Sequence, residues 1–121
     1  AILVKLIGSE LRQRISGVSE VGPGEATRML NHDNAVIVDM REDKDYREGH
    51  IVNAVHTPAS NSDAVQKLEK FRERPVIVYC RSGHTSNGFC SKLRKQGFAS
   101  VYNLAGGVLA WQKAGLPLNR G

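Results

Sequence analysis

The segment Val76-Ile77-Val78-Tyr79-Cys80-Arg81-Ser82-Gly83-His84-Thr85-Ser86 joins an apolar run to a loop of small and polar residues. The run 76–79 does not alternate with polar residues, as a strand with one solvated face would. A second run of this kind, Ala35-Val36-Ile37-Val38, lies earlier in the chain. Together the two runs predict buried strands of a parallel sheet that is covered by helices on both faces.

Weaker strands and four helices are predicted around these two runs. The strands lie at 17–21, 51–56 and 99–103. One helix takes Pro23 into its first turn, and a second follows Ser60 and Asp63, which resemble a capping box. A third follows the loop after Cys80 and ends at Gly97, and a fourth starts near Gly107. Strands that alternate with helices predict an α/β fold.

Size and composition favour one compact domain in a reducing compartment. The chain has 121 residues, which suits a single hydrophobic core, and its two cysteines cannot form a disulfide framework. We therefore expect a cytoplasmic monomer. The net charge of +5 favours anionic ligands, but basic residues are interspersed with acids and few aromatics lie between them. This pattern argues against nucleic-acid binding.

The first residues, 1–16, form an N-terminal extension to a domain that we place at 17–121. Ala1-Ile2-Leu3-Val4 is apolar and is followed by the basic residues Arg12 and Arg14. One interpretation is the remnant of a membrane anchor that tethers the domain to the cytoplasmic face of a membrane. The other is an amphipathic helix that packs on the domain, since apolar residues recur at four-residue spacing. The sequence leaves both open.

Cys80 stands where a predicted buried strand ends and a helix is about to begin. In open α/β sheets, ligands bind beyond the carboxyl ends of the strands. Backbone N–H groups of such a loop, together with a helix N-terminus, favour an anion and lower the pKa of a cysteine from about 8.5. Arg81 adds positive charge. A buried cysteine that merely ends a strand is the alternative, but this context favours an activated thiol.

Other reactive side chains are assigned mainly structural roles. Cys90 falls on an apolar helical face and is expected in the core, as is Trp111. The histidines and cysteines lack the spacing of a zinc site, so no metal is expected. His50 follows a helix-to-strand turn and is interpreted as structural. His84 lies in the loop itself, where it either faces solvent or tunes the thiol.

Asp39 and Arg41 lie at the carboxyl end of the other buried strand. This position borders the same edge of the sheet as Cys80. A structural ion pair and a role in substrate binding are equally consistent with the sequence, and both stay open.

Three segments resemble the signatures of the rhodanese family, in the family's order. The first is Val38-Asp39-Met40-Arg41-Glu42 with Tyr46, Gly49-His50-Ile51 and Ala54. The second is the stretch from Tyr79 to Ser86. The third is Leu104-Ala105-Gly106-Gly107 with Ala110-Trp111 and Gly115-Leu116-Pro117. The resemblance spans 20–117, and the three segments together are specific where each alone is not.

The resemblance implies a five-stranded, mainly parallel sheet with helices on both faces. It implies that Cys80 attacks the outer sulfur of thiosulfate or a similar anionic donor and keeps that sulfur as a persulfide. Cyanide, a thiol or an acceptor protein then removes the sulfur, and no cofactor is needed. The residues expected to bind substrate are Arg81, Ser82, Gly83, His84, Thr85, Ser86 and Arg41.

Two positions depart from the family pattern. Asn53 stands where the family usually has glycine, and asparagine tolerates a left-handed backbone better than most residues. Thr85 stands where many relatives carry arginine, which leaves the preferred donor open.

Two rival functions remain to be weighed. A phosphatase or arsenate reductase of a related fold needs cysteine, five residues and then arginine, but the residue at that place is Ser86, and the loop is one residue short. A non-catalytic or sulfur-relay module that docks a partner protein is the second rival. The retained Cys80 favours chemistry over docking alone.

Overall fold

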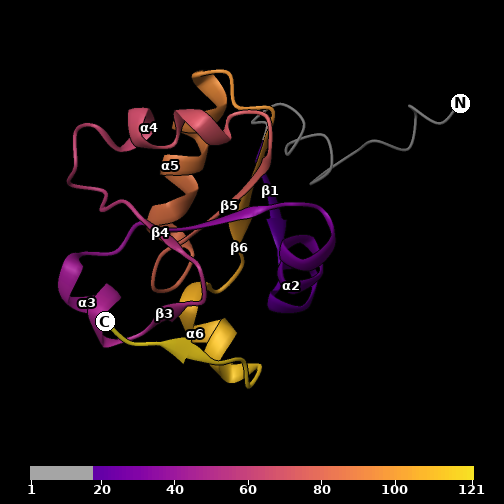
Figure 1. Ribbon diagram of the computed structural model, residues 1–121, viewed down its shortest axis with the longest axis vertical. Coiled ribbons are helices and arrows are strands. Elements are labelled where there is room, and N and C mark those ends of the chain that lie inside the picture. The colour runs from indigo at the N-terminus through magenta and orange to yellow at the C-terminus, as the bar shows by residue number, and fades with distance from the viewer. Residues whose placement is uncertain (1–17) are drawn as a thin grey trace, which may run out of the picture.

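A five-stranded parallel sheet forms the centre of the computed structural model, which describes residues 18–121 (Figure 1). The strand order is β1-β6-β5-β2-β4, and every neighbouring pair is parallel. The strands are β1 (Val18–Val21), β6 (Ser100–Leu104), β5 (Pro75–Tyr79), β2 (Val36–Asp39) and β4 (Val55–His56). The two apolar runs are the adjacent strands β2 and β5, which confirms the predicted fold class.

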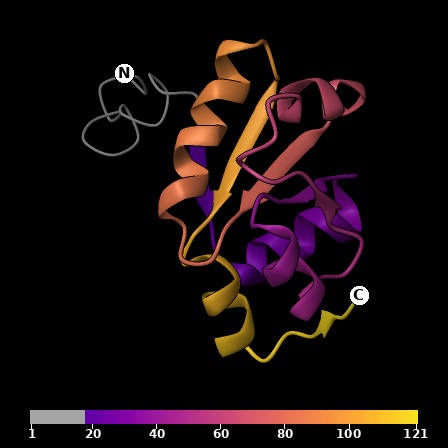
Figure 2. The ribbon, with the colours of Figure 1, turned by 90° about the vertical axis from the view of Figure 1, so that its left-hand side faces the viewer.

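Helices cover both faces of this sheet. Helix α5 (His84–Lys95), α4 (Ala64–Lys67) and the 3-10 turn η2 (Glu69–Phe71) pack on one face. Helices α2 (Pro23–His32) and α6 (Gly107–Lys113) pack on the other. Figure 2 shows α5 along one side of β5 and β6, with α2 on the other side.

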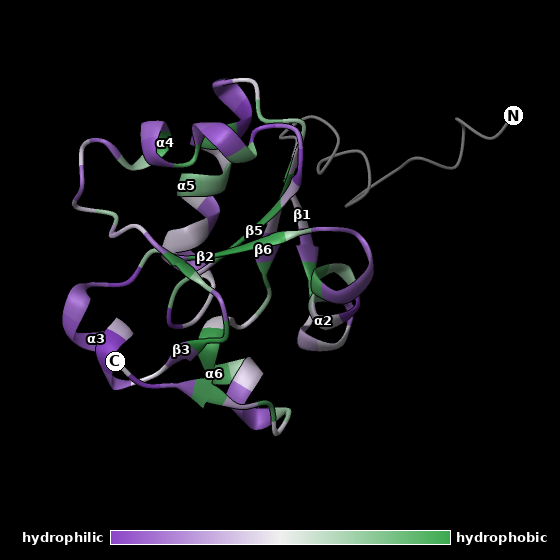
Figure 3. Cartoon of the chain, viewed as in Figure 1, coloured by the Kyte–Doolittle hydropathy of each residue, from purple (hydrophilic) through white to green (hydrophobic). Residues whose placement is uncertain are grey.

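Residues of β5 alternate between two apolar cores. Val76 and Val78 pack with Leu93 of α5, whereas Ile77 packs on the opposite face with Met29 of α2. Because both faces are buried, the strand needs apolar residues at every position. Figure 3 accordingly shows β2 and β5 in the green of hydrophobic residues.

The predicted strand at 51–56 is wrong as a single element. It is divided into β3 (His50–Ile51) and β4, and β3 pairs antiparallel with β7 (Leu118–Asn119), a strand that the sequence did not predict. Between β3 and β4 the chain turns at Asn53, whose φ is 66°, and Ala54 N–H donates to the Ile51 carbonyl at 3.0 Å. Asparagine therefore supports the left-handed turn where the family usually has glycine.

The expected capping box at Ser60 and Asp63 is also wrong. The Ser60 hydroxyl donates to the Glu42 carboxylate at 3.3 Å, and the Asp63 N–H donates to Oδ1 of Asn61 at 2.8 Å. Helix α4 begins at Ala64 without a side-chain cap. Local hydrogen bonding of the asparagine and a long-range contact of the serine replace the reciprocal cap.

The other predicted helices are present, but α5 begins at His84, inside the segment 81–86 that the sequence assigned to the loop. Pro23 opens α2, and α5 ends before Gly97, whose φ is 94°. A short helix, α3 (Asp43–Glu48), leads through Gly49 into β3. The two interpretations of 1–16 concern a segment outside the described residues. Within 18–121, no helix combines the length and apolarity needed to cross a bilayer.

Candidate active site

Cys80 directly follows β5, at the carboxyl edge of the sheet, and α5 begins at His84. The loop between them turns at Gly83, which has a φ of 98° and precedes the first residue of α5. A Cβ atom at Gly83 would also lie 3.1 Å from the backbone nitrogen of Gly106. Glycine is therefore required here both by the backbone conformation and by the close approach of the loop after β6.

The sulfur of Cys80 lies inside a set of hydrogen-bond donors. The backbone N–H groups of Gly83 and Ser86 donate to Sγ at 3.1 and 3.4 Å. Burial raises the pKa of the Cys80 thiol, but the hydrogen bonds around the sulfur lower it by more. The pKa of Cys80 therefore lies below its ordinary value. The side chain is only 6% exposed, so a small reagent must reach it through the loop.

A chain of polar side chains continues from Cys80 into the sheet. The thiol contacts the Ser86 hydroxyl at 3.2 Å, and that hydroxyl donates to Oδ1 of Asn103 at 2.5 Å. Nδ2 of Asn103 donates to the Glu20 carboxylate and to the Gly83 carbonyl, each at 2.9 Å. Ser86 and Asn103 are both buried, so these hydrogen bonds replace water.

Asn103 and Glu20 were not identified from the sequence. Asn103 lies near the carboxyl end of β6, and Glu20 is its register partner in β1. A polar residue at the end of a buried strand is the signal that could have marked Asn103. Its partner could not be chosen without the strand order.

The loop rests on the first turn of α6. The Val108 N–H donates to the Cys80 carbonyl at 3.0 Å, and the Leu109 N–H donates to the Arg81 carbonyl at 3.2 Å. Of the residues expected to bind substrate, four have exposed side chains: Arg81, Ser82, His84 and Thr85. Their contribution inside the loop is therefore made by the backbone, while their side chains lie at its outer surface.

Arg41 forms a buried ion pair with Asp39. Its Nη2 lies 2.7 Å from Oδ2 of Asp39 and also donates to the Gly49 carbonyl at 2.6 Å. The Tyr79 hydroxyl donates to the same carboxylate at 2.6 Å. Arg41 also lines a pocket of about 280 Å³ together with Arg81. The ion pair that the sequence left open is thus present, and Arg41 reaches the pocket wall beside the loop.

The residues assigned structural roles are placed in packed surroundings. Cys90 is fully buried, and burial raises the pKa of its thiol to about 12. Trp111 is buried and donates through Nε1 to the Pro117 carbonyl at 3.0 Å. His50 is buried and stacks on Tyr46 with ring centroids 3.9 Å apart. These positions confirm that the three residues belong to the packed interior.

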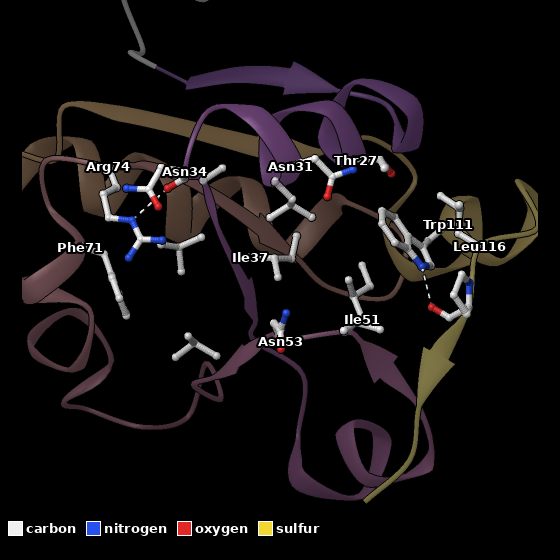
Figure 4. A pocket seen from close by; sticks show the side chains of 16 residues that line it. Thr27, Asn31, Asn34, Ile37, Ile51, Asn53, Phe71, Arg74, Trp111 and Leu116 are labelled. Carbon is white, nitrogen blue, oxygen red and sulfur yellow. Dashed lines mark hydrogen bonds between the residues drawn. The ribbon is translucent and has the colours of Figure 1, made fainter.

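A large pocket lies away from Cys80. It has a volume of about 660 Å³ and is mostly apolar, with Ile37 and Ile51 in its wall, Trp111 and Leu116 toward one end and Arg74 toward the other (Figure 4). Cys80 is not among its lining residues. Among residues 18–121, no group of three or more His, Cys, Asp or Glu side chains is arranged to hold a metal ion.

The fold and the position of Cys80 define the class of protein. A parallel α/β sheet with a cysteine loop at its carboxyl edge is the arrangement that the three sequence signatures predicted. The family model for the Rhodanese-like domain matches residues 22–114. The chain belongs to the rhodanese-like domain family.

Individual relatives agree with this assignment. The chain is 39% identical over 123 residues to the uncharacterized protein YibN of Escherichia coli strain K12, a match that covers 100% of this chain and 86% of that protein. It is 38% identical over 89 residues to the thiosulfate sulfurtransferase GlpE of Coxiella burnetii, covering 73% of this chain and 81% of that one. The crystal structure of the Alr3790 protein from Anabaena is similar, with a TM-score of 0.75 and 26% identity over 84% of this chain and 82% of that chain.

Proposed function

We propose that this domain is a sulfurtransferase that moves a sulfane sulfur from thiosulfate or a similar anionic donor to a thiophilic acceptor. The observation that carries the proposal is the sulfur of Cys80, held at the carboxyl edge of the sheet by the N–H groups of Gly83 and Ser86. Because its pKa is lowered, more of the Cys80 thiol is present as the nucleophilic thiolate at a given pH than in a free cysteine. The relatives named sulfurtransferase give the proposal further support.

The reaction has two steps. The Cys80 thiol first loses its proton to solvent, and the thiolate attacks the outer sulfur of thiosulfate. A new S–S bond forms at Cys80, the original S–S bond breaks, and sulfite leaves with the bonding electron pair. Cyanide or a thiolate then attacks the outer sulfur of the persulfide and restores the Cys80 thiolate. A covalent intermediate of this kind predicts ping-pong kinetics.

The loop suits a persulfide anion. Its negative charge lies on the outer sulfur, which is bonded to the Cys80 sulfur that receives the Gly83 and Ser86 N–H groups. N–H groups that point toward one place stabilise such a charge without reorganisation. Arg81 is exposed at the outer surface of the loop, where its charge attracts an anionic donor. Because the Arg41 guanidinium is already paired with Asp39, we assign the larger share of this attraction to Arg81.

Transfer to an acceptor protein is favoured by one further observation. Leu109 is 47% exposed and lines the same pocket as Arg81, directly beside the loop. An apolar and a basic side chain beside the Cys80 loop provide a contact surface for a partner that carries a thiol.

Phosphate cleavage is disfavoured by the position of Ser86. This residue occupies the place where a phosphatase needs an arginine to clamp the oxyanion. Its side chain is fully buried and bound to Asn103, so it points into the sheet instead of over the loop.

Intact-mass spectrometry without reductant tests the proposal. Thiosulfate treatment should add one sulfur atom to the wild-type protein, and Cys80→Ser should abolish the addition. The matched control Cys90→Ser, which changes the other cysteine, should still take up sulfur. Sulfur on Cys90, no uptake by the wild type, or phosphatase turnover faster than thiosulfate turnover would overturn the proposal.

A further inference from the structure

The Ser86 hydroxyl lies between two atoms that compete for its single proton. On one side is Sγ of Cys80 at 3.2 Å, and on the other is Oδ1 of Asn103 at 2.5 Å. A serine hydroxyl can donate only one hydrogen bond. The direction of the O–H bond therefore determines whether Ser86 donates a hydrogen bond to the sulfur or accepts one from it.

The orientation of the Asn103 amide fixes that direction. Nδ2 of Asn103 donates one proton to the Glu20 carboxylate and one to the Gly83 carbonyl. A flipped amide would place Oδ1 against both of these acceptors, so the observed orientation is held from two sides. Oδ1, which can only accept, therefore faces Ser86, and the Ser86 proton points toward Asn103.

We propose that Asn103, held by Glu20, is a positioning residue that directs the Ser86 hydroxyl proton away from the Cys80 sulfur. The protonated thiol then donates to Ser86. The sulfur anion, by contrast, receives hydrogen bonds only from the backbone N–H groups of the loop and faces a lone pair of Ser86. Asn103 thus opposes ionisation of Cys80, while the loop backbone promotes it.

The arrangement has a consequence for the persulfide, which rests on the proposed function. In the persulfide the negative charge lies on the outer sulfur, one bond farther from Ser86. The Ser86 hydroxyl can then keep donating its hydrogen bond to Asn103, because the charged sulfur is no longer the one beside it. The polar chain therefore favours charge on the outer sulfur over charge on Cys80 itself, and so favours the sulfur-loaded form.

Four ionisable groups besides Cys80 belong to this polar chain or lie near it. Glu20 of β1 and His84 at the start of α5 line a pocket of about 290 Å³ together with Asn103. Arg81 follows Cys80 in the chain, and the buried Cys90 of α5 lies in the same apolar core as Cys80. The principal variants leave all four unchanged, so that any shift of the Cys80 titration reports on the hydrogen bonds.

The pH dependence of Cys80 alkylation by iodoacetamide, followed by peptide mass spectrometry, tests the inference. Asn103→Leu removes the acceptor and frees the Ser86 proton for the sulfur, so the pKa of Cys80 should fall by about one unit, a tenfold gain in thiolate well below that pKa. In a Ser86→Ala background the same substitution should have no effect. The matched control Asn87→Leu, at an exposed position of α5, should leave the pKa unchanged.

A purely structural role of Asn103 gives the opposite result. Loosening the loop would misalign the N–H donors, so the pKa of Cys80 would rise in Asn103→Leu, and it would do so with or without the Ser86 hydroxyl. Either a rise, or an equal fall in the Ser86→Ala background, would overturn the inference.

Variants of Glu20 provide a second test if Asn103→Leu does not fold. Glu20 is exposed, so its replacement is tolerated more easily than a change inside the sheet. Glu20→Ala lets the Asn103 amide rotate and should lower the pKa of Cys80 further than Glu20→Gln, which removes the charge but keeps an acceptor. Equal shifts of the Cys80 pKa in the two variants would show that loss of the Glu20 charge alone causes them, and would contradict the inference.

Alkylation and sulfur loading separate this inference from the proposed function. If the wild type takes up no sulfur from thiosulfate while the shifts in pKa occur as stated, the proposed function fails and the positioning role stands. If the wild type loads sulfur and Asn103→Leu shows no fall in pKa, the positioning role fails alone.

Discussion

Gly107 lies directly against the carbonyl oxygen of Cys80. A Cβ atom at position 107 would meet that oxygen at 2.5 Å, and Gly107 has a φ of 58°. The close approach lets the next residue, Val108, donate its N–H to the same carbonyl. The first turn of α6 thus supports the strand end from which the reactive sulfur projects.

Replacing Gly107 should lower the stability of the fold. Gly107→Ala introduces a left-handed strain and a clash with backbone, and should lower the free energy of unfolding by about 3 kcal/mol. Urea unfolding measures this. The matched control is Gly88→Ala on the open surface of α5, which should instead raise stability by about 0.5–1 kcal/mol because alanine favours a helix. Equal effects of the two substitutions would contradict the packing described for α6.

The Asp39–Arg41 pair should contribute far more to stability than a surface pair. Arg41→Leu leaves the fully buried Asp39 carboxylate without its cation and should cost about 3–5 kcal/mol in urea unfolding. Arg47→Leu breaks the exposed pair with Asp43, whose partners are 70% and 63% exposed, and should cost less than about 1 kcal/mol. A small cost for Arg41→Leu would mean that water reaches Asp39 readily.

The two cysteines should differ in reactivity over the whole neutral pH range. Hydrogen bonds of the loop hold the pKa of Cys80 below its ordinary value, so its alkylation rate should reach half of its plateau at a lower pH than that of a free cysteine. Cys90 is buried and its pKa is raised to about 12, so it should stay unmodified in the folded protein. Peptide mapping after a pH series separates the two. Faster alkylation of Cys90 would refute the assignment of the nucleophile.

The same pKa shift predicts a dependence of stability on pH. Because the thiol is more acidic in the folded than in the unfolded chain, the unfolded chain binds more protons between the two pKa values. The stabilising contribution of Cys80 is therefore present above the unfolded pKa and is lost as pH falls through the folded pKa. Urea unfolding of wild type and Cys80→Ser across this range should show a difference that grows with pH. A difference in stability that shrinks as pH rises would mean that the fold raises the pKa of Cys80 instead of lowering it.

Arg81 should act through its charge on an anionic donor. Arg81→Glu should lower the second-order rate constant for loading from thiosulfate by about tenfold at low ionic strength, and added salt should shrink the difference. Stopped-flow or quenched mass spectrometry gives the rate. Arg28→Glu, a charge reversal on α2 across the sheet from α5, is the control and should change the rate little. An effect of Arg81→Glu that does not depend on salt would indicate loop distortion instead.

The sequence predicted the parts of the fold that depend on continuous local patterns. The runs 35–38 and 76–79, which contribute to β2 and β5, are apolar at every position because both faces of the sheet are buried. This pattern can be recognised in the sequence alone. The left-handed backbone at Asn53 was anticipated only through the family resemblance, because the residues from Ile51 to His56 also fit one continuous strand. The strand β7 has only two residues and depends on its partner β3.

The site was predictable to the extent that it is local. Cys80 and its loop occupy one short segment, so the end of the strand, the cysteine and the helix that follows could be inferred together, although α5 begins earlier than expected. The link from Ser86 through Asn103 to Glu20 joins residues 83 positions apart at its far end. It exists because β1 and β6 are neighbours in the sheet, a fact that the spacing of residues does not contain.

The most direct test of the central claim follows the two sulfur atoms of thiosulfate separately. Thiosulfate labelled with a heavy isotope at the outer sulfur should transfer the label to the peptide that contains Cys80, and thiosulfate labelled at the inner sulfur should release all of it as sulfite. Label from the inner sulfur on the protein, or outer label on any residue other than Cys80, would contradict persulfide formation at this thiol.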